Sequence, residues 1–246
     1  MLNIKRILNL GSHVILVEFD TEIKPESLHQ LLKIKAVLAK KYHHKKVEVT
    51  NTYASLCIHF LNENKIELNT EKERIKSIIS SIDLSEISSA ISSKLHVLPV
   101  CYADEFAPDL DFLAKELKLS KQQIINLHTE PKYTIYFHGF LPGFLYLGGL
   151  PETLHFPRKK TPRLQIPKGS VGIGGEQTGV YPSESPGGWQ LIGNCPLDLF
   201  DVYQNPPTQF QAGDQIQFEA ISKEAHQEIK QQVKEGKYQH QIQTHD

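Results

Sequence analysis

The sequence predicts an α+β protein with a small α+β N-terminal domain followed by a β-barrel or β-sandwich. The first 95 residues alternate strand-like and helix-like hydrophobic patterns, as expected for a mixed domain. The chain then changes character: twelve of its fifteen glycines lie between positions 139 and 193, a density that suits short strands joined by tight turns. A chain of 246 residues can form one large domain or two modest ones.

The first elements follow from hydrophobic periodicity. A strand is expected over residues 10–19. A helix is expected over residues 24–42, because leucines recur there at helical spacing and Pro25 lies in the first turn, where its missing N–H does no harm. A pair of strands is expected at residues 47–50 and 55–61.

A second helix is predicted to close the N-terminal domain. Thr70 and Glu73 have the spacing of a capping box, in which each side chain accepts a hydrogen bond from the other residue's backbone N–H. A stripe of isoleucines follows it at helical spacing. The serine-rich stretch 80–93 then leads out of the domain, so the first domain is expected to cover residues 1–95.

The second domain is expected to cover residues 96–222, with a polar C-terminal helix or tail at 223–246. It opens with a strand at 96–101 and a short helix, and a capping box of Ser120 and Gln123 starts a second helix. Further strands are expected at residues 133–137, 170–174, 189–192, 197–203 and 215–221.

Composition narrows the classes of function. The formal net charge is −1, so no overall field recruits nucleic acid, and no apolar run approaches the roughly 18 residues that span a membrane. The N-terminus lacks a signal-peptide cleavage pattern. Three scattered cysteines, Cys57, Cys101 and Cys195, favour a reducing compartment. We therefore expect a cytoplasmic protein without nucleic-acid or membrane partners.

Standard catalytic and nucleotide motifs do not match. The outline GxxxxG at 188–193 is followed by Asn194 and Cys195, where a phosphate loop requires Lys and Ser or Thr. Residues 172–175 lack the third glycine of a dinucleotide fingerprint. No serine lies in GxSxG, and no histidine or cysteine pair has metal-ligand spacing, so we expect no metal site.

Cations and hydrogen-bonding groups are concentrated in the glycine-rich region. The strip PRKKTPR (157–163) presents four cations on a backbone stiffened by two prolines, which suits capture of carboxylate or phosphate and equally suits a solvated loop. Trp189 is either a core residue or a pocket wall. His128 is either a structural histidine or a general acid or base. The oily, bent ribbon at 139–152 is expected to form a site wall or a docking surface.

Several segments of the sequence match those of a known protein family. They are LPVCY (98–102), APDL (107–110), NLHT (126–129), GFLPGFLYLGGLP (139–151), PRKKTPR (157–163), IPKGSVGIGGEQTGVYP (166–182), SPGGWQLIG (185–193), LFD (199–201) and GDQIQF (213–218). In this order they resemble the KipI / allophanate hydrolase subunit 1 family. One departure is Asn194, where the family usually has arginine, and Asn194 is therefore left out of the expected site.

The resemblance implies a small α+β N-terminal domain and a cyclophilin-like β-barrel C-terminal domain. It also implies one component of a multi-subunit, ATP-dependent 5-oxoprolinase, which opens 5-oxo-L-proline to L-glutamate after phosphorylation of the lactam oxygen. ATP, with Mg²⁺, would bind at the interface with the partner subunit. Two partners are implied: a second, barrel-fold subunit of the C type and a third subunit of the A type. The alternative is a KipI-like regulator that inhibits a sensor histidine kinase. Two further alternatives are a prolyl isomerase, which rests on fold analogy alone, and a scaffold whose partners carry all of the chemistry.

Under the leading hypothesis the cationic side chains bind negatively charged groups of the ligand, and the neighbouring groups orient the substrate. Arg158 and Arg163 would hold carboxylate or phosphate, Lys168 would add charge, and His128 would transfer a proton. Substrate binding is expected at Gln177, Tyr181, Ser185, Gly187, Gly188 and Trp189.

Overall fold

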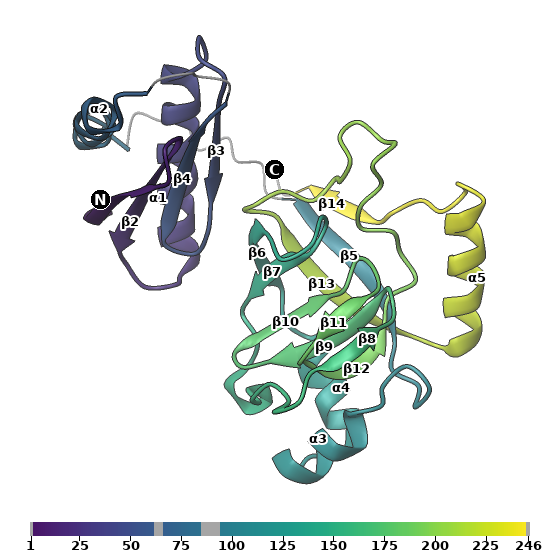
Figure 1. Cartoon of the computed structure of the whole chain (residues 1–246). Coiled ribbons are helices and arrows are strands. Elements are labelled where there is room, and N and C mark those ends of the chain that lie inside the picture. The colour runs from purple at the N-terminus through teal and green to yellow at the C-terminus, as the bar shows by residue number, and fades with distance from the viewer. Residues whose placement is uncertain (1, 62–65, 85–93, 245–246) are drawn as a thin grey trace. The chain divides into compact units, whose positions relative to one another are not determined.

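The computed structural model describes residues 2–61, 66–84 and 94–244 (Figure 1). The chain divides into two compact units, residues 1–91 and 92–246. The sequence placed the boundary near residue 95, four residues after the first unit ends. Most of the serine-rich connection lies outside the described residues.

The first unit is built on a four-stranded antiparallel sheet. Its strands lie in the order β1 (Asn3–Leu10), β2 (Val14–Asp20), β4 (Ser55–Phe60) and β3 (Val47–Asn51). Burial alternates along β2 and β4, so one face of the sheet is buried and the other is partly exposed. The predicted strands are all present, and β1 is an additional strand that hairpins onto β2.

Two helices contribute to the core on the buried face of this sheet. The predicted first helix is confirmed as α1 (Pro25–Lys41). The second, α2 (Leu68–Ser80), begins before Thr70 and has no side-chain cap, so the predicted capping box is wrong. Ile66 and Leu68 pack against the core, and this burial moves the start of the helix toward the N-terminus.

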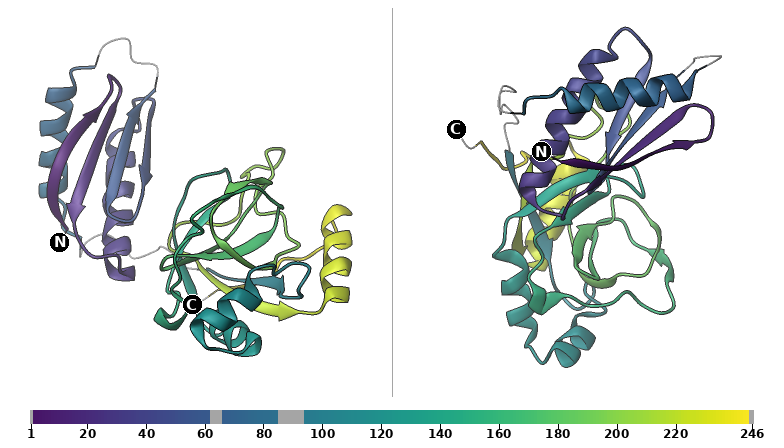
Figure 2. Two further views of the ribbon diagram at one scale, coloured as in Figure 1. Left: turned by 60° about the horizontal axis from the view of Figure 1, so that its bottom comes forward. Right: turned by 90° about the vertical axis from the view of Figure 1, so that its left-hand side faces the viewer.

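The second unit contains a large sheet that nearly closes into a barrel (Figure 2). Its strands follow the order β10 (Gln177–Val180), β9 (Ser170–Gly174), β12 (Gln190–Asn194), β5 (Lys94–Cys101), β13 (Gln215–Ile221), β6 (Tyr133–His138) and β7 (Leu145–Gly148). The two outer strands, β7 and β10, contact each other. β5 and β13 pair in parallel, and the other neighbours in this order pair antiparallel. A barrel-like sheet is thus confirmed, and the cyclophilin-like assignment stays a prediction.

Smaller elements cover the barrel and extend it. A separate two-stranded ribbon joins β8 (Arg163–Ile166) to β11 (Ser185–Gly187), and a 3-10 turn, η1, covers Glu152–Leu154. α3 (Leu110–Leu117) is followed by α4 (Lys121–Thr129), which starts with the predicted capping box of Ser120 and Gln123. The prediction of a strand at 197–203 is wrong: these residues form a loop.

The C-terminal segment belongs to the second unit. α5 (Lys223–Lys234) directs Ile229 and Val233 onto the barrel core, and Tyr238 follows them. β14 (Ile242–Thr244) then pairs antiparallel with the start of β5. The tail is therefore a docked part of this unit. Within the described residues, no helix is long and apolar enough to span a membrane.

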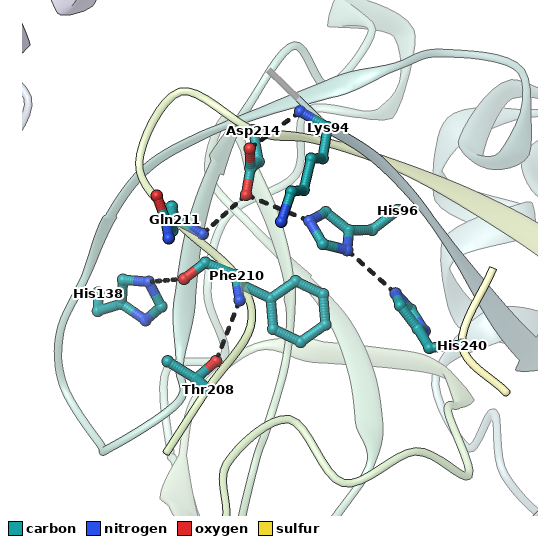
Figure 3. Close-up of polar contacts among 8 residues, drawn as sticks. All are labelled: Lys94, His96, His138, Thr208, Phe210, Gln211, Asp214 and His240. Atoms are coloured by element: carbon teal, nitrogen blue, oxygen red, sulfur yellow. Dashed lines mark hydrogen bonds and ion pairs between the residues drawn. The ribbon is translucent and has the colours of Figure 1, made fainter. Parts of the chain in front are cut away.

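A buried carboxylate joins three parts of the second unit (Figure 3). Asp214, which directly precedes β13, accepts hydrogen bonds from the backbone N–H groups of Lys94 and Gln211 at 3.0 and 2.9 Å. His96 Nε2 lies 3.2 Å from the same carboxylate, and His96 Nδ1 lies 3.1 Å from His240 Nε2. Asp214 therefore fixes the start of β5 and, through His96, the C-terminal segment.

Replacing Asp214 with alanine is expected to destabilise the second unit by about 2 to 4 kcal/mol, because buried donors lose their acceptor. Trp189 is the single tryptophan and lies in this unit, so its fluorescence during urea unfolding reports the loss. Asp198→Ala serves as the control, since Asp198 is half exposed in a surface ion pair. Equal stabilities for the two variants would contradict the role of Asp214.

Candidate functional site

An aromatic cavity of about 230 Å³ opens on the second unit. Five residues expected from the sequence line it: Arg158, Tyr181, Gly187, Gly188 and Trp189. Phe140, Phe144 and Tyr146 come from the ribbon 139–152 that was expected to form a wall, and Pro162 and Pro186 complete the lining. The cavity is thus a largely apolar pocket with a guanidinium in its wall.

The position of Trp189 depends on two glycines that lie against its ring, Gly174 and Gly179. A Cβ added at Gly174, in β9, would lie 2.5 Å from Trp189 Nε1, and one at Gly179, in β10, would lie 3.2 Å from Trp189 Cζ3. The indole therefore packs directly on the backbone of two strands, which glycine alone permits. Its ring centroid lies 5.5 Å from that of Phe144 and 6.2 Å from that of Tyr181. These edge-on contacts make one wall of the cavity.

Substituting Gly174 with alanine is expected to displace the indole and to shift Trp189 emission toward longer wavelength, because the new methyl group overlaps the ring. Overpacking of this kind costs about 1 to 3 kcal/mol in stability. Gly188→Ala is the comparison, since a Cβ there meets nothing closer than 3.7 Å. An unchanged emission spectrum in Gly174→Ala would show that this glycine is not needed to position the indole of Trp189.

The oily ribbon at residues 139–152 contributes Phe140, Phe144 and Tyr146 to the lining of the cavity. It folds back on itself, with Leu141 N–H donating to Gly139 C=O at 2.7 Å and Phe144 N–H donating to Leu141 C=O at 3.0 Å. Phe144 is buried, whereas Phe140 is 57% exposed and has a positive φ of 63°, which is uncommon for a bulky residue. The expectation that this ribbon forms a wall agrees with the geometry.

Arg158 lies over the face of the indole. Its Cζ is 5.8 Å from the centroid of Trp189, within the range of a cation–π interaction. The strip 157–163 runs along residues 188–190: Lys159 N–H donates to Gly188 C=O at 2.7 Å, and Gln190 Nε2 donates to Pro157 C=O at 3.2 Å. Arg158 is exposed and is one of the residues that line the cavity.

Arg163 is committed to a protein carboxylate instead. Its Nη2 donates to Asp109 Oδ1 at 2.7 Å, and Lys159 Nζ donates to the same oxygen at 3.1 Å. Burial alone raises the pKa of the Asp109 carboxyl, but hydrogen bonds from Arg163, Leu191 and Lys159 outweigh it and hold the pKa below its ordinary value. The predicted pairing of Arg163 with a ligand is therefore not supported, because its Nη2 pairs with Asp109 and Arg163 does not line the aromatic cavity.

Lys168 lies apart from the aromatic cavity. It forms an ion pair of 2.6 Å with Asp198 and lines another cavity, of about 500 Å³, beside α5. Asn194 lines that cavity too: its Nδ2 donates to Lys168 C=O at 3.0 Å, and its Oδ1 lies 2.8 Å from His226 Nε2. The predicted cation set is thus divided among three places, and Asn194 has a structural role.

Of the remaining predicted polar groups, Tyr181 lines the cavity, whereas Ser185 and Gln177 do not. Tyr181 is buried, and its hydroxyl lies where a Cβ on Gly187 would come within 2.5 Å. Burial raises the pKa of Tyr181, so the phenol stays protonated and its hydroxyl remains a donor. Ser185 is buried with no hydrogen-bond partner for its hydroxyl among the described residues. Gln177 begins β10 and does not line the cavity.

His128 lies in the barrel core, away from the cavity. Thr178 donates its single hydroxyl proton to Gly172 C=O at 3.0 Å, so His128 Nε2, at 2.7 Å, must donate to Thr178. His128 Nδ1 then accepts from Tyr102 OH at 2.7 Å. Burial lowers the pKa of His128 to about 3. The predicted proton transfer is not supported, because both ring nitrogens are used and the ring is fully buried.

This burial predicts acid-sensitive stability. The folded-state pKa of His128 lies below the unfolded value of 6.5, so the unfolded chain binds the proton first and stability falls as pH drops from 6.5 toward 3. At about pH 4.5 the loss relative to pH 7 amounts to about 3 kcal/mol. The His128→Gln variant is expected to lose less free energy of unfolding on acidification than the parent chain does. Urea unfolding followed by Trp189 fluorescence measures this difference. Exposed His44→Gln should behave like the parent chain, and an identical acid loss in His128→Gln would contradict the argument.

Comparisons with known proteins place this geometry in a family. The model of the family described as "Carboxyltransferase domain, subdomain C and D" matches residues 5–210. The B subunit of 5-oxoprolinase from Bacillus subtilis (strain 168) is 47% identical over 151 residues, 61% of this chain and 63% of that protein. The protein of the same name from Haemophilus influenzae (strain ATCC 51907 / DSM 11121 / KW20 / Rd) is 55% identical over 121 residues, 49% of this chain and 57% of that protein. The matches thus span about three fifths of the length of these relatives, and they confirm the resemblance predicted from the sequence.

Solved structures show the same fold. The Kluyveromyces lactis urea carboxylase superposes with a TM-score of 0.77 at 19% identity, over 98% of this chain and 25% of that one. A conserved uncharacterised protein from Pyrococcus horikoshii is 35% identical with a TM-score of 0.53, over 90% of this chain and all of that one.

Proposed function

The chain belongs to the family of carboxyltransferase domains, subdomains C and D, and we propose that it is one component of a 5-oxoprolinase complex. The complex would open the lactam of 5-oxo-L-proline to L-glutamate at the expense of ATP. The names of the two curated relatives support this assignment. In this proposal the aromatic cavity holds the substrate.

The observation that carries the proposal is the pairing of Arg158 with aromatic walls in a small cavity. 5-Oxo-L-proline is a five-membered lactam ring that carries one carboxylate. The rings of Phe144 and Trp189 provide faces and edges for the lactam ring, and Arg158 provides a guanidinium for the carboxylate. A volume of about 230 Å³ suits a ligand of this size.

ATP does not fit this cavity. A triphosphate needs several cations or a glycine-rich loop with its lysine, whereas Arg158 is the cation among the described residues that line the cavity. Arg163 and Lys168 are engaged with Asp109 and Asp198. We therefore assign the substrate ring to this chain and propose that ATP binds elsewhere in the assembled complex.

Partner proteins would complete the site. Phe140, on the rim, is 57% exposed, and Leu164, two residues beyond the cavity residue Pro162, is 92% exposed. Exposed apolar side chains beside a cavity favour coverage by another protein. We propose that the second, barrel-fold partner lies over this rim, and that the second and third partners supply the groups that bind ATP.

The test is co-expression with the second and third components of the complex, followed by measurement of glutamate release from 5-oxo-L-proline. Arg158→Ala is expected to lower kcat/KM by about 10- to 100-fold, because the carboxylate loses its charged partner. Lys160→Ala is the control, since Lys160 is an exposed cation of the same strip that does not line the cavity.

Two outcomes would contradict the proposal. Full activity of Arg158→Ala would remove the carboxylate role of this residue. A well-formed complex that releases no glutamate would overturn the 5-oxoprolinase assignment. In the latter case the alternative, a KipI-like regulator that grips a proline-containing segment, is tested by titrating the chain with proline-rich peptides and following Trp189 fluorescence.

A further inference from the structure

We propose that Asp109 is the positioning residue of the aromatic cavity. Its carboxylate holds the cation strip 157–163 against β12, and this attachment sets Arg158 over the face of Trp189. The nature of the ligand rests on the proposed function, whereas the positioning itself rests on contacts within the chain.

Asp109 gathers hydrogen-bond donors from separate segments. It precedes α3 and is only 4% exposed. Its Oδ1 accepts from Arg163 Nη2 at 2.7 Å and from Lys159 Nζ at 3.1 Å, and its Oδ2 accepts from the backbone N–H of Leu191 at 2.7 Å. A single carboxylate thus joins α3, the strip and β12, and charge-assisted bonds of this kind are the strong ones.

The strip transmits this attachment to Arg158. Lys159 is the next residue along, and its backbone N–H is bonded to Gly188 C=O. Pro162 restricts the backbone between Lys159 and Arg163, and Pro157 restricts it just before Arg158. A shift of Lys159 or Arg163 would therefore move Arg158 relative to the indole.

Asp109 also decides which cation faces the ligand. Arg163 Nη1 is buried and has no hydrogen-bond partner among the described residues, so this guanidinium depends on Asp109 for charge compensation. While Asp109 is ionised, Arg163 and Lys159 are directed toward it and Arg158 is left to the cavity. This arrangement matches a ligand with a single carboxylate.

The test compares Asp109→Asn with Asp111→Asn in the full chain. The first change removes the buried charge and keeps the side-chain shape. The second removes the charge of a 79% exposed carboxylate on the same helix, paired with Lys121, and is the matched control. Acrylamide quenching of Trp189 fluorescence, without ligand, is expected to rise about twofold or more in Asp109→Asn and to stay at the parental value in Asp111→Asn, because the guanidinium no longer covers the indole. Unchanged quenching in folded Asp109→Asn would overturn the proposal.

Ligand binding gives a second readout. Titration with 5-oxo-L-proline, followed by Trp189 emission, is expected to show a Kd about tenfold higher for Asp109→Asn than for the parent or the control. If Asp109→Asn does not fold, Lys159→Met removes one donor and leaves the carboxylate, and a smaller change in quenching in the same direction is expected. Parental quenching in Lys159→Met would then overturn the proposal.

Failure of the proposed function would look different. In that case the parent chain would not bind 5-oxo-L-proline and the assembled complex would release no glutamate, while quenching of Trp189 would still separate Asp109→Asn from Asp111→Asn. The positioning role would then stand for a ligand of another class.

Discussion

The packing of Trp189 on bare backbone is the constraint on which the second unit's cavity depends. An indole can lie flat against β9 and β10 because Gly174 and Gly179 carry no side chain at the points of contact. Once it is seated there, Phe144 and Tyr181 meet its edges and Arg158 covers its face. The glycine-rich stretch therefore provides a backbone surface on which the indole of Trp189 packs. The cavity lies beside this indole.

Buried polar groups keep this surface in place. Asp109 holds the cation strip against β12, the chain from Tyr102 through His128 to Thr178 crosses the barrel interior, and Asp214 fixes the start of β5. Each of the two carboxylates is surrounded by donors, which is what makes a buried charge tolerable. Chemistry and stability are divided between different residues: Arg158 faces the cavity, whereas Arg163 and His128 support the structure.

The sequence predicted what local patterns determine. The helix with Pro25 in its first turn and the capping box of Ser120 were visible because hydrophobic spacing and short-range hydrogen bonds specify them. Thr70 shows where such local prediction fails. The sequence there has a complete capping box, but the packing of Ile66 and Leu68 makes the helix begin before Thr70. Leu197 and Leu199 are buried as in a strand, yet the loop that carries them pairs with no neighbouring strand among the described residues.

The site was predicted in part for the same reason. Arg158, Tyr181 and Trp189, which the sequence analysis grouped in one site, line one cavity, and their roles there stay predictions. Which arginine of the strip is free could not be read from the strip itself, because the deciding partner, Asp109, lies 54 residues from Arg163 in the chain. Whether His128 has a structural or an acid–base role could not be decided from the sequence for the same reason. Its hydrogen-bond partners, Tyr102 and Thr178, come from distant segments of the chain.

We propose that this cavity recognises a small ring through its aromatic walls and one carboxylate through Arg158. This recognition is tested most directly by comparing 5-oxo-L-proline with 2-pyrrolidinone, the same lactam ring without the carboxylate, in titrations of the chain that follow Trp189 emission. The account predicts saturable binding of 5-oxo-L-proline and an affinity at least about tenfold lower for 2-pyrrolidinone. Equal affinities, or no response of Trp189 to either compound, would contradict it.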